Sequence, residues 1–180
     1  MGKPDISIII ISYNTAQITK DCLNSIIISL KNTTVKYEII VVDNNSKDGS
    51  QDMLKGFVNK YPEILKIILN SENTGFGKAN NQGVKIASSE YILVLNSDTV
   101  TLNNSIEKLL TFYKENEDYA HFVGAKLFNK DMSDQSSAAP FFTLPVVFAA
   151  LFLKGDYWGL TRASPDIIKK VDWVSGACII

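Results

Sequence analysis

The stretch YILVLNSD, residues Tyr91–Asp98, decides the fold of this chain. A run of Ile, Leu and Val bounded by polar residues is typical of a strand that is buried on both faces of a sheet. Such a strand would carry Asp98 to the carboxyl edge of the sheet, where open α/β folds bind their ligands. We therefore expect an α/β protein with a site at the end of this strand.

Two earlier apolar runs end in the same way. Ile6–Ser12 leads to Tyr13 and Asn14, and Tyr37–Val42 leads to Asp43-Asn44. Because the carboxyl ends of parallel strands meet at one edge, the three strand ends would bring polar groups together. This convergence favours a site for a polar, phosphate-bearing ligand.

Strands and helices alternate along the chain, which predicts a mostly parallel sheet with helices on both faces. The predicted strands are Ile6–Ser12, Tyr37–Val42, Leu65–Leu69 and Tyr91–Leu95, with later strands at Phe122–Phe128 and Val171–Ile180. Helices are predicted over Thr15–Leu30, after Gly49, over Gly77–Ala87 and from about Asn104.

Helical spacing also predicts which side chains are buried. The first helix should bury Ile18, Cys22 and Ile26, and the second a stripe from Met53 to Val58. Lys130–Ala139 is polar and rich in small residues, which predicts a mobile loop.

Composition excludes several classes of protein. The 180 residues are 46% hydrophobic and 21% charged, as in ordinary soluble proteins, and the net charge of −1 argues against a general nucleic-acid surface. His121 is the single histidine, which excludes a multi-histidine metal site, and Cys22 and Cys178 form no zinc or redox motif. No signal peptide or apolar run of about 18 residues is present, so we expect a cytoplasmic protein.

Asp43 follows four apolar residues and could accept a hydrogen bond from a nucleobase imide or a ribose hydroxyl. The alternative is an Asp that starts a turn or caps the following helix.

Asn73–Asn81 combines two glycines with a predicted helix N-terminus, where free N–H groups and the helix dipole favour anions. A dinucleotide-binding fingerprint would need a third glycine where Asn80 stands, and would follow the first strand rather than the third. A nicotinamide site is therefore disfavoured, and a glycine turn that simply caps the helix is the other alternative.

Asn96-Ser97-Asp98 is the candidate metal site. Mg²⁺ or Mn²⁺ takes carboxylate oxygens and keeps waters and substrate phosphates as further ligands, so one carboxylate and a diphosphate would suffice. The alternative is an Asp that only ends a strand.

Two later segments could contact an acceptor. Trp173 lies beside the small residues Ser175, Gly176 and Ala177, and an aromatic face can pack against a sugar, although a core Trp next to a glycine bulge fits equally. The Phe-rich segment Phe141–Leu153 fits a core or covering helix best, with a membrane-interface helix as the alternative.

In their order and spacing, these motifs resemble the nucleotide-binding half of family 2 glycosyltransferases. The similarity lies in Ser12–Asn14, Val42–Ser50, Asn73–Gly83 and Asn96–Thr99. It is greatest for the rhamnosyltransferase-like branch, which Asp172–Cys178 also fits.

The resemblance implies a GT-A fold, a nucleoside-diphosphate sugar donor (dTDP-rhamnose or a UDP-sugar), Mg²⁺ or Mn²⁺, and inverting transfer to a glycan or lipid-linked acceptor. Asp98 matches the last acidic residue of the family's metal-binding DxD motif, whose first Asp is replaced by Asn96. The donor-binding residues implied are Ser12, Tyr13, Asn14, Asp43, Asn44, Asn73, Gly75, Phe76, Asn80, Asn96 and Ser97. The acceptor-side residues implied are Trp173, Ser175, Gly176 and Ala177.

By the same resemblance, residues 1–128 form the nucleotide-sugar-binding domain and residues 129–180 begin an acceptor-side region. The family's catalytic base, an Asp in a Glu-Asp motif, would follow Ile180, so we expect a truncated chain that transfers sugar poorly. The alternatives are a non-catalytic nucleotide-sugar-binding module and, less favoured, a nicotinamide oxidoreductase domain.

Overall fold

The computed structural model describes residues 2–153 and 161–180. The chain forms two compact units, one that runs to His121 and also includes Ile180, and one that spans Phe122–Ile179. The structure thus divides the chain after His121, whereas the sequence predicted a division after Phe128.

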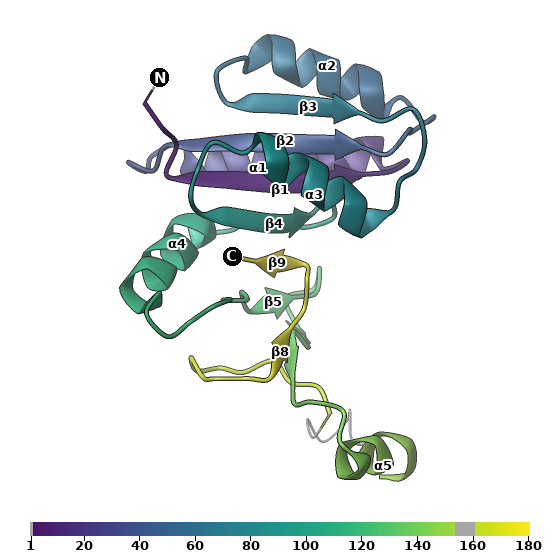
Figure 1. The fold of residues 1–180 in the computed structure, drawn as a ribbon, viewed down its shortest axis with the longest axis vertical. Helices are drawn as coiled ribbons and strands as arrows, with labels where there is room; N and C mark the ends of the chain where they lie inside the picture. Colours follow the sequence, from purple (N-terminus) through teal and green to yellow (C-terminus); the bar gives the residue numbers. More distant parts are fainter. Residues whose placement is uncertain (1, 154–160) are drawn as a thin grey trace. The chain divides into compact units, whose positions relative to one another are not determined.

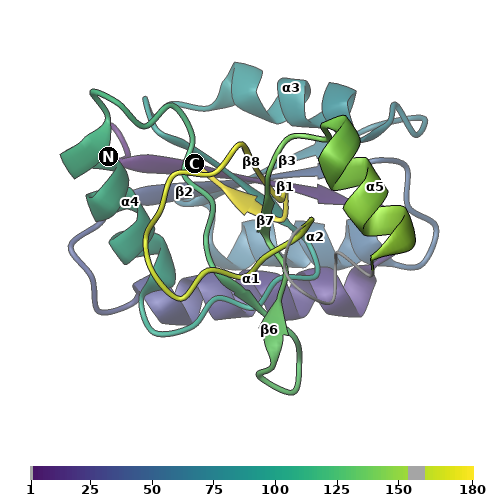
Figure 2. The ribbon, with the colours of Figure 1, turned by 90° about the horizontal axis from the view of Figure 1, so that it is seen from below.

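The first unit is an α/β layer structure (Figure 1). Its strands pair in parallel in the order β3-β2-β1-β4, and α3 covers the face of the sheet opposite α1 and α2 (Figure 2). The strands are β1 Ile6–Ser12, β2 Tyr37–Asp43, β3 Leu65–Leu69 and β4 Ile92–Asn96. The helices are α1 Ala16–Leu30, α2 Ser50–Lys60, α3 Phe76–Ile86 and α4 Ser105–Asn116. This architecture confirms the predicted α/β fold.

The strands buried on both faces are β1 and β2 rather than β4. Ile8, Ile9 and Ile10 of β1 and Ile39–Val42 of β2 are completely buried, because helices cover both faces of the sheet at these strands (Figure 2). In β4 only Leu93 and Leu95 are buried, and the alternate residues Ile92, Val94 and Asn96 remain partly exposed. The prediction that Tyr91–Leu95 is covered on both faces was therefore wrong, since an apolar run does not reveal how completely each face of a strand is covered.

Helix α3 packs very closely on the sheet. A Cβ atom at Gly83 would lie 2.6 Å from Cγ2 of Ile9 and 3.5 Å from Cγ2 of Val42. Ala79, one turn earlier, is also fully buried. The small residues Ala79 and Gly83 thus form the face of α3 that packs on the sheet.

The buried faces of helices α1 and α2 differ from those that their periodicity predicted. Cys22 and Ile26 are completely buried, but Ile18 is 48% exposed, which corrects the predicted face of α1. In the stripe predicted for α2, only Leu54 is fully buried. The first turn of α1 instead borders a pocket, described below.

At the amino edge of the sheet, the buried carboxylate of Glu38 links several elements. It accepts hydrogen bonds from the Ser7 hydroxyl and the Ser88 N–H, both at 2.5 Å, and forms an ion pair with Lys66 at 2.6 Å. Burial alone would raise the pKa of Glu38, but the hydrogen bonds from Lys66, Ser7 and Ser88 outweigh it and lower that pKa.

The second unit contains short strands and one helix. Strands β5 (Leu127–Phe128) and β6 (Asp134–Gln135) form an antiparallel hairpin, and β7 (Ala138–Ala139) pairs with β8 (Trp173–Val174). The remaining elements are α5 (Leu144–Phe152) and β9 (Cys178–Ile179).

These elements correct three predictions. The strand expected over Phe122–Phe128 is reduced to β5, and the one expected over Val171–Ile180 is broken by a turn at residues 176–177. The segment expected to be a loop, Lys130–Ala139, contributes β6 and β7.

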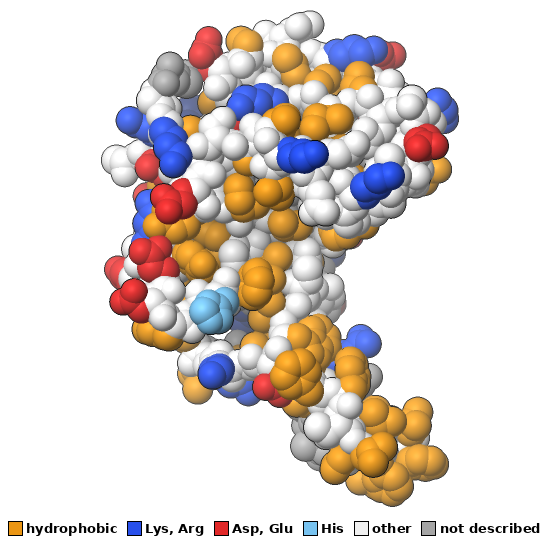
Figure 3. Space-filling view, in the orientation of Figure 1, with side chains coloured by type: hydrophobic (Ala, Val, Ile, Leu, Met, Phe, Trp, Pro, Cys, Tyr) orange, Lys and Arg blue, Asp and Glu red, His pale blue; other side chains and the backbone are white. Residues whose placement is uncertain are grey.

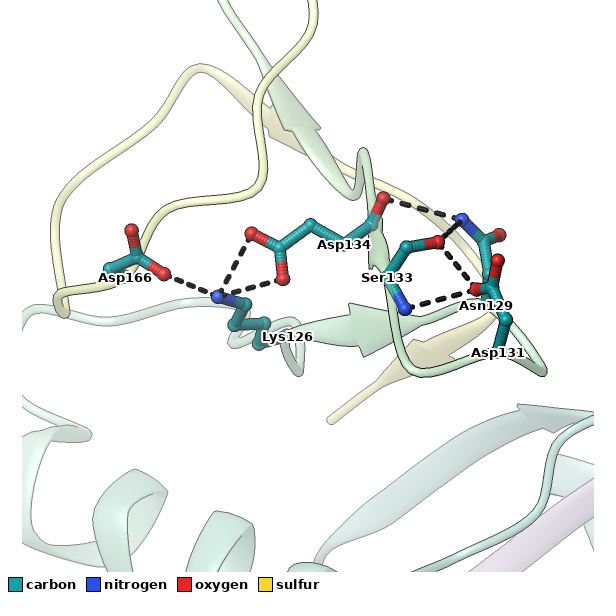
Figure 4. A network of polar contacts seen from close by, with 6 residues as sticks. All are labelled: Lys126, Asn129, Asp131, Ser133, Asp134 and Asp166. Atoms are coloured by element: carbon teal, nitrogen blue, oxygen red, sulfur yellow. Dashed lines mark hydrogen bonds and ion pairs between the residues drawn. The ribbon is translucent and has the colours of Figure 1, made fainter.

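Lys126 is the centre of a polar network in this unit (Figure 4). Its ammonium group forms ion pairs with Asp134 at 3.1 Å and Asp166 at 2.5 Å, and these carboxylates raise the pKa of Lys126. Beside it, the Asp131 carboxylate accepts hydrogen bonds from the N–H and hydroxyl of Ser133. The network ties the β5–β6 hairpin to the chain near Asp166.

Helix α5 buries none of its side chains, so the expectation of a core or covering helix was wrong for the residues that are described. Figure 3 shows hydrophobic side chains gathered over this helix. Leu144 is 87% exposed and Leu151 71% exposed. Within residues 2–153 and 161–180, no helix combines the length and apolarity needed to cross a bilayer.

Candidate functional site

A pocket of about 410 Å³ lies at the carboxyl edge of the parallel sheet. Residues from the ends of β1, β2 and β4 contribute to it, together with the first turn of α1 and the start of α3. Its lining is Ile11, Tyr13, Thr15, Ile18, Asn44, Asn73, Phe76, Asn96, Ser97 and Asp98. The three strand ends therefore converge on one cavity.

The predicted donor and metal residues divide into two groups. Those that line the pocket are Tyr13, Asn44, Asn73, Phe76, Asn96, Ser97 and Asp98. Those that lie outside the lining are Ser12, Asn14, Asp43, Gly75 and Asn80. The second group shapes the loops that carry the first.

Asp43 is completely buried, and both of its carboxylate oxygens accept hydrogen bonds. Oδ1 accepts from the Ser46 N–H at 2.9 Å and from the Gln51 amide at 3.1 Å, while Oδ2 accepts from the Ser46 hydroxyl at 2.5 Å. The structure thus places Asp43 as the anchor of the loop between β2 and α2.

Asn14 and Asp48 fasten the loop after β1 to the loop after β2. The Asn14 N–H donates to the Ser46 hydroxyl, and its side-chain oxygen accepts from the Lys47 N–H at 2.7 Å. Asp48 accepts from the Ala16 N–H at 2.8 Å and from the Ser50 hydroxyl at 2.5 Å, so it serves the first turns of both α1 and α2. The hydrogen bond from Ser50, followed by that from Ala16, lowers the pKa of Asp48.

Ser12 is also internal. It is completely buried, and its hydroxyl lies 3.4 Å from that of Thr15 and 3.3 Å from that of Thr19. This hydroxyl cluster fixes the start of α1 against the end of β1.

An amide network holds the loop that follows β3. The Asn44 side-chain oxygen accepts hydrogen bonds from Asn70 at 2.9 Å and from the Thr74 hydroxyl at 3.2 Å. Asn70 and Gln82 exchange two further amide hydrogen bonds. As a result, Asn73 and the first residue of α3, Phe76, are presented to the pocket.

Helix α3 begins at a sharp turn. The Gly75 N–H donates to the Asn73 side chain at 2.9 Å, and Gly75 has φ +83°, a conformation that favours glycine. Asn80 donates to the Phe76 carbonyl at 3.0 Å, and its buried Oδ1 has no hydrogen-bond partner among the described residues.

Asp98 is the acidic residue of the pocket lining. It is exposed, and within the described part of the chain no hydrogen bond or ion pair engages its carboxylate. The described residues contain no group of three His, Cys, Asp or Glu side chains that could enclose a metal. The site therefore fits a cation such as Mg²⁺ or Mn²⁺ that takes most of its ligands from phosphates and water.

Sequence reasoning missed three residues of the lining: Ile11, Thr15 and Ile18. Ile18 had been assigned to the buried face of α1. Its position could have indicated a place at the pocket, because Ile18 lies in the first turn of α1, shortly after the polar end of β1.

The predicted acceptor-side residues belong to the second unit. The Trp173 indole N–H donates to the Pro140 carbonyl at 3.1 Å, and its ring stacks near Phe142. Ser175 donates its N–H to Ser137 at 2.7 Å, and the turn at Gly176-Ala177 follows. These contacts support the local fold, and an acceptor role stays a prediction.

Comparison with solved structures supports the GT-A fold. A mannosyltransferase from Pyrobaculum calidifontis in complex with GDP-Man and Mn²⁺ superposes with a TM-score of 0.59 at 20% identity, over 71% of this chain and 36% of that one. TarS 1–349 of S. aureus in complex with UDP superposes with a TM-score of 0.57 at 20% identity, over 79% of this chain and 44% of that one.

Among curated proteins, a poly(ribitol-phosphate) beta-glucosyltransferase of Bacillus spizizenii is 36% identical over 115 residues, which are 62% of this chain and 18% of the relative. The chain spans half or less of the length of the first curated relatives that it matches. The model of the family described as glycosyl transferase family 2 matches residues 7–164. The chain therefore belongs to glycosyl transferase family 2.

Proposed function

We propose that this chain forms the donor side of a glycosyltransferase and binds a nucleoside-diphosphate sugar together with Mg²⁺ or Mn²⁺. The observation that carries the proposal is the pocket at the carboxyl edge, where the unpaired Asp98 carboxylate lies among amide and aromatic side chains. A sugar nucleotide presents a flat base, hydroxyl groups and a diphosphate, and the pocket offers groups that suit each of them.

The residues have distinct proposed roles. The rings of Tyr13 and Phe76, 49% and 53% exposed, provide apolar faces for the base or the sugar. Asn44 and Asn73 supply amides that can hydrogen-bond to hydroxyls. A contact between Asp43 and the base, expected from the family resemblance, would require Gln51 to leave Oδ1.

Asp98 is the proposed protein ligand of the cation, with Asn96 and Ser97 beside it. A divalent ion there would neutralise charge on a departing nucleoside diphosphate. Because Asp98 is a single carboxylate, the affinity for the cation should depend strongly on the bound diphosphate.

The finer assignments follow from the motifs. A UDP-sugar or dTDP-rhamnose is the proposed donor, in line with the rhamnosyltransferase-like motifs, and TarS, a structural neighbour, is solved with UDP. A glycan or lipid-linked acceptor, inverting transfer, a cytoplasmic location and membrane contact through residues 141–153 complete the proposal. Family membership removes the nicotinamide alternative.

Calorimetric titration tests this proposal with UDP, dTDP, GDP and NAD, each with and without Mn²⁺. We expect UDP or dTDP to bind with Mn²⁺, and Asp98→Asn to weaken this metal-dependent binding by about tenfold or more. Asp52→Asn is the matched control, because Asp52 is an exposed carboxylate on α2 outside the pocket lining.

Two results would contradict the proposal. One is binding of NAD without binding of any nucleoside diphosphate. The other is binding of UDP or dTDP with the same affinity in the Asp98→Asn and Asp52→Asn variants in the presence of Mn²⁺.

A further inference from the structure

The loop that carries Asp98 is a tight turn with few internal hydrogen bonds. The Thr99 N–H donates to the Asn96 carbonyl at 3.2 Å, which places Ser97 and Asp98 at the centre of the turn. Since the Asp98 side chain has no hydrogen bond to any described residue, its position depends on the backbone of this turn.

One turn of α1 contacts the loop before Asp98. The Cys22 thiol is completely buried and lies 3.7 Å from the Asn96 carbonyl oxygen. A thiol is a weak donor, so this contact acts mainly through packing. It nevertheless fixes the residue at which the turn begins.

The same helical turn contacts the loop after Asp98. The Ser25 hydroxyl accepts hydrogen bonds from the Thr101 N–H at 3.0 Å and the Thr101 hydroxyl at 3.2 Å. It donates in turn to the Cys22 carbonyl at 2.7 Å. One hydroxyl thereby uses its donor and both of its acceptor positions, and Thr101 is only 9% exposed.

We infer that Ser25 is a positioning residue for the cation site: with Cys22, it holds the Asn96–Thr101 loop on both sides of Asp98. This inference rests on the proposed function. Loss of the Ser25 hydroxyl leaves the largely buried Thr101 N–H without its acceptor and frees the loop after Asp98. Residues that orient metal ligands typically change metal affinity by 10–100-fold when they are replaced.

The chain offers a matched control on the same helix. Ser29 lies one turn after Ser25 and is buried, but its hydroxyl has no hydrogen-bond partner among the described residues. Ser25→Ala and Ser29→Ala therefore remove the same atom from neighbouring turns of α1, and of these two hydroxyls it is that of Ser25 that is hydrogen-bonded to the loop in the described part of the chain. Ser25→Thr keeps the hydroxyl and should retain the wild-type behaviour.

The experiment measures the dissociation constant of UDP and dTDP with and without Mn²⁺, and hydrogen exchange at the Thr99 and Thr101 amides. In Ser25→Ala we expect about tenfold weaker metal-dependent nucleotide binding, unchanged metal-free binding, and faster exchange at Thr101. Ser29→Ala and Ser25→Thr should match the wild type in both measurements.

The outcomes separate this inference from the proposed function. If the wild type shows no Mn²⁺-dependent nucleotide binding, the proposed function fails and the inference fails with it. If the wild type binds but Ser25→Ala matches Ser29→Ala, the inference alone is overturned. Two further results for Ser25→Ala would overturn the inference: nucleotide binding weakened equally with and without Mn²⁺, or an unchanged rate of hydrogen exchange at the Thr101 amide. In either case Ser25 would not position the loop for the cation.

Discussion

At the scale of single residues, Asp48 shows how one carboxylate can organise a binding edge. It accepts hydrogen bonds at the first turns of α1 and α2, and so joins the loops that follow β1 and β2. Helix N-termini have free N–H groups, and a carboxylate near them also interacts favourably with the helix dipole.

Asp48→Ala should therefore lower the free energy of unfolding by about 0.5–2 kcal/mol, the range expected for the loss of a helix cap. Denaturant titration measures this change. Asp52→Ala is the control: Asp52 also lies in the first turn of α2, but among the described residues its carboxylate contacts only Lys55, in an exposed ion pair, so the change should be smaller, about 0.5 kcal/mol. Equal effects of the two substitutions would show that Asp48 does not join the loops.

The site residues could be located from the sequence better than their roles. Tyr13 and Asp98 follow apolar runs, so their place at the pocket was predictable. Asn14 was selected for the same reason, but its partner Lys47 lies 33 residues away. A role that depends on a contact so distant in sequence cannot be derived from local pattern.

At the scale of elements, the contact between α3 and β1 gives a sharp prediction. Gly83→Ala would place a Cβ atom 2.6 Å from Ile9, so α3 must shift or Ile9 must change its conformation. Overpacking of this kind typically costs about 1–3 kcal/mol. We expect the denaturation midpoint of Gly83→Ala to fall accordingly.

Gly56→Ala is the matched control in α2. No described residue lies within 4 Å of a Cβ atom at Gly56, and alanine is the better helix former by about 0.5–1 kcal/mol. This variant should therefore be more stable than the wild type. If both variants were stabilised, the close packing of α3 on β1 would be refuted.

The elements of the first unit were largely predictable because their patterns are local. β1 and β3 have the predicted bounds, since runs rich in Ile and Leu end at polar residues there. The partial burial of β4 and the exposure of Ile18 were not predictable, because they depend on what covers each face of the sheet and on the position of the pocket.

At the scale of the whole molecule, the structure of the second unit could not be predicted from the sequence. Its strands contain only two residues each, too few to show the alternation of apolar and polar residues by which a strand is identified. Contacts that hold the unit together, such as that of Lys126 with Asp166, join residues that lie 40 positions apart in the sequence. The apolar run of α5 suggested burial, yet its side chains are exposed.

The stability of the whole molecule should depend on pH, because carboxyl groups from both units contribute to it. The pKa values of Glu38, Asp48, Asp131 and Asp166 are all lowered in the folded chain, so each group favours folding when it is ionised. Their contribution is complete above the pKa of the unfolded carboxyl groups, about 4, and is lost as the pH falls through the lower folded values. We expect stability to decline steeply below about pH 4.

Glu38 is the group whose contribution can be isolated, because it is only 5% exposed and its partners are known. Glu38→Gln keeps the shape but loses the charge, so it should destabilise the protein at pH 7. The difference from the wild type should shrink as the pH falls below about 4, since the wild-type carboxylate is then protonated as well. Thermal unfolding across pH 3 to 7 measures both curves, with the exposed Glu63→Gln as control. Parallel curves for the wild type and Glu38→Gln would show that the ionised Glu38 does not stabilise the amino edge of the sheet.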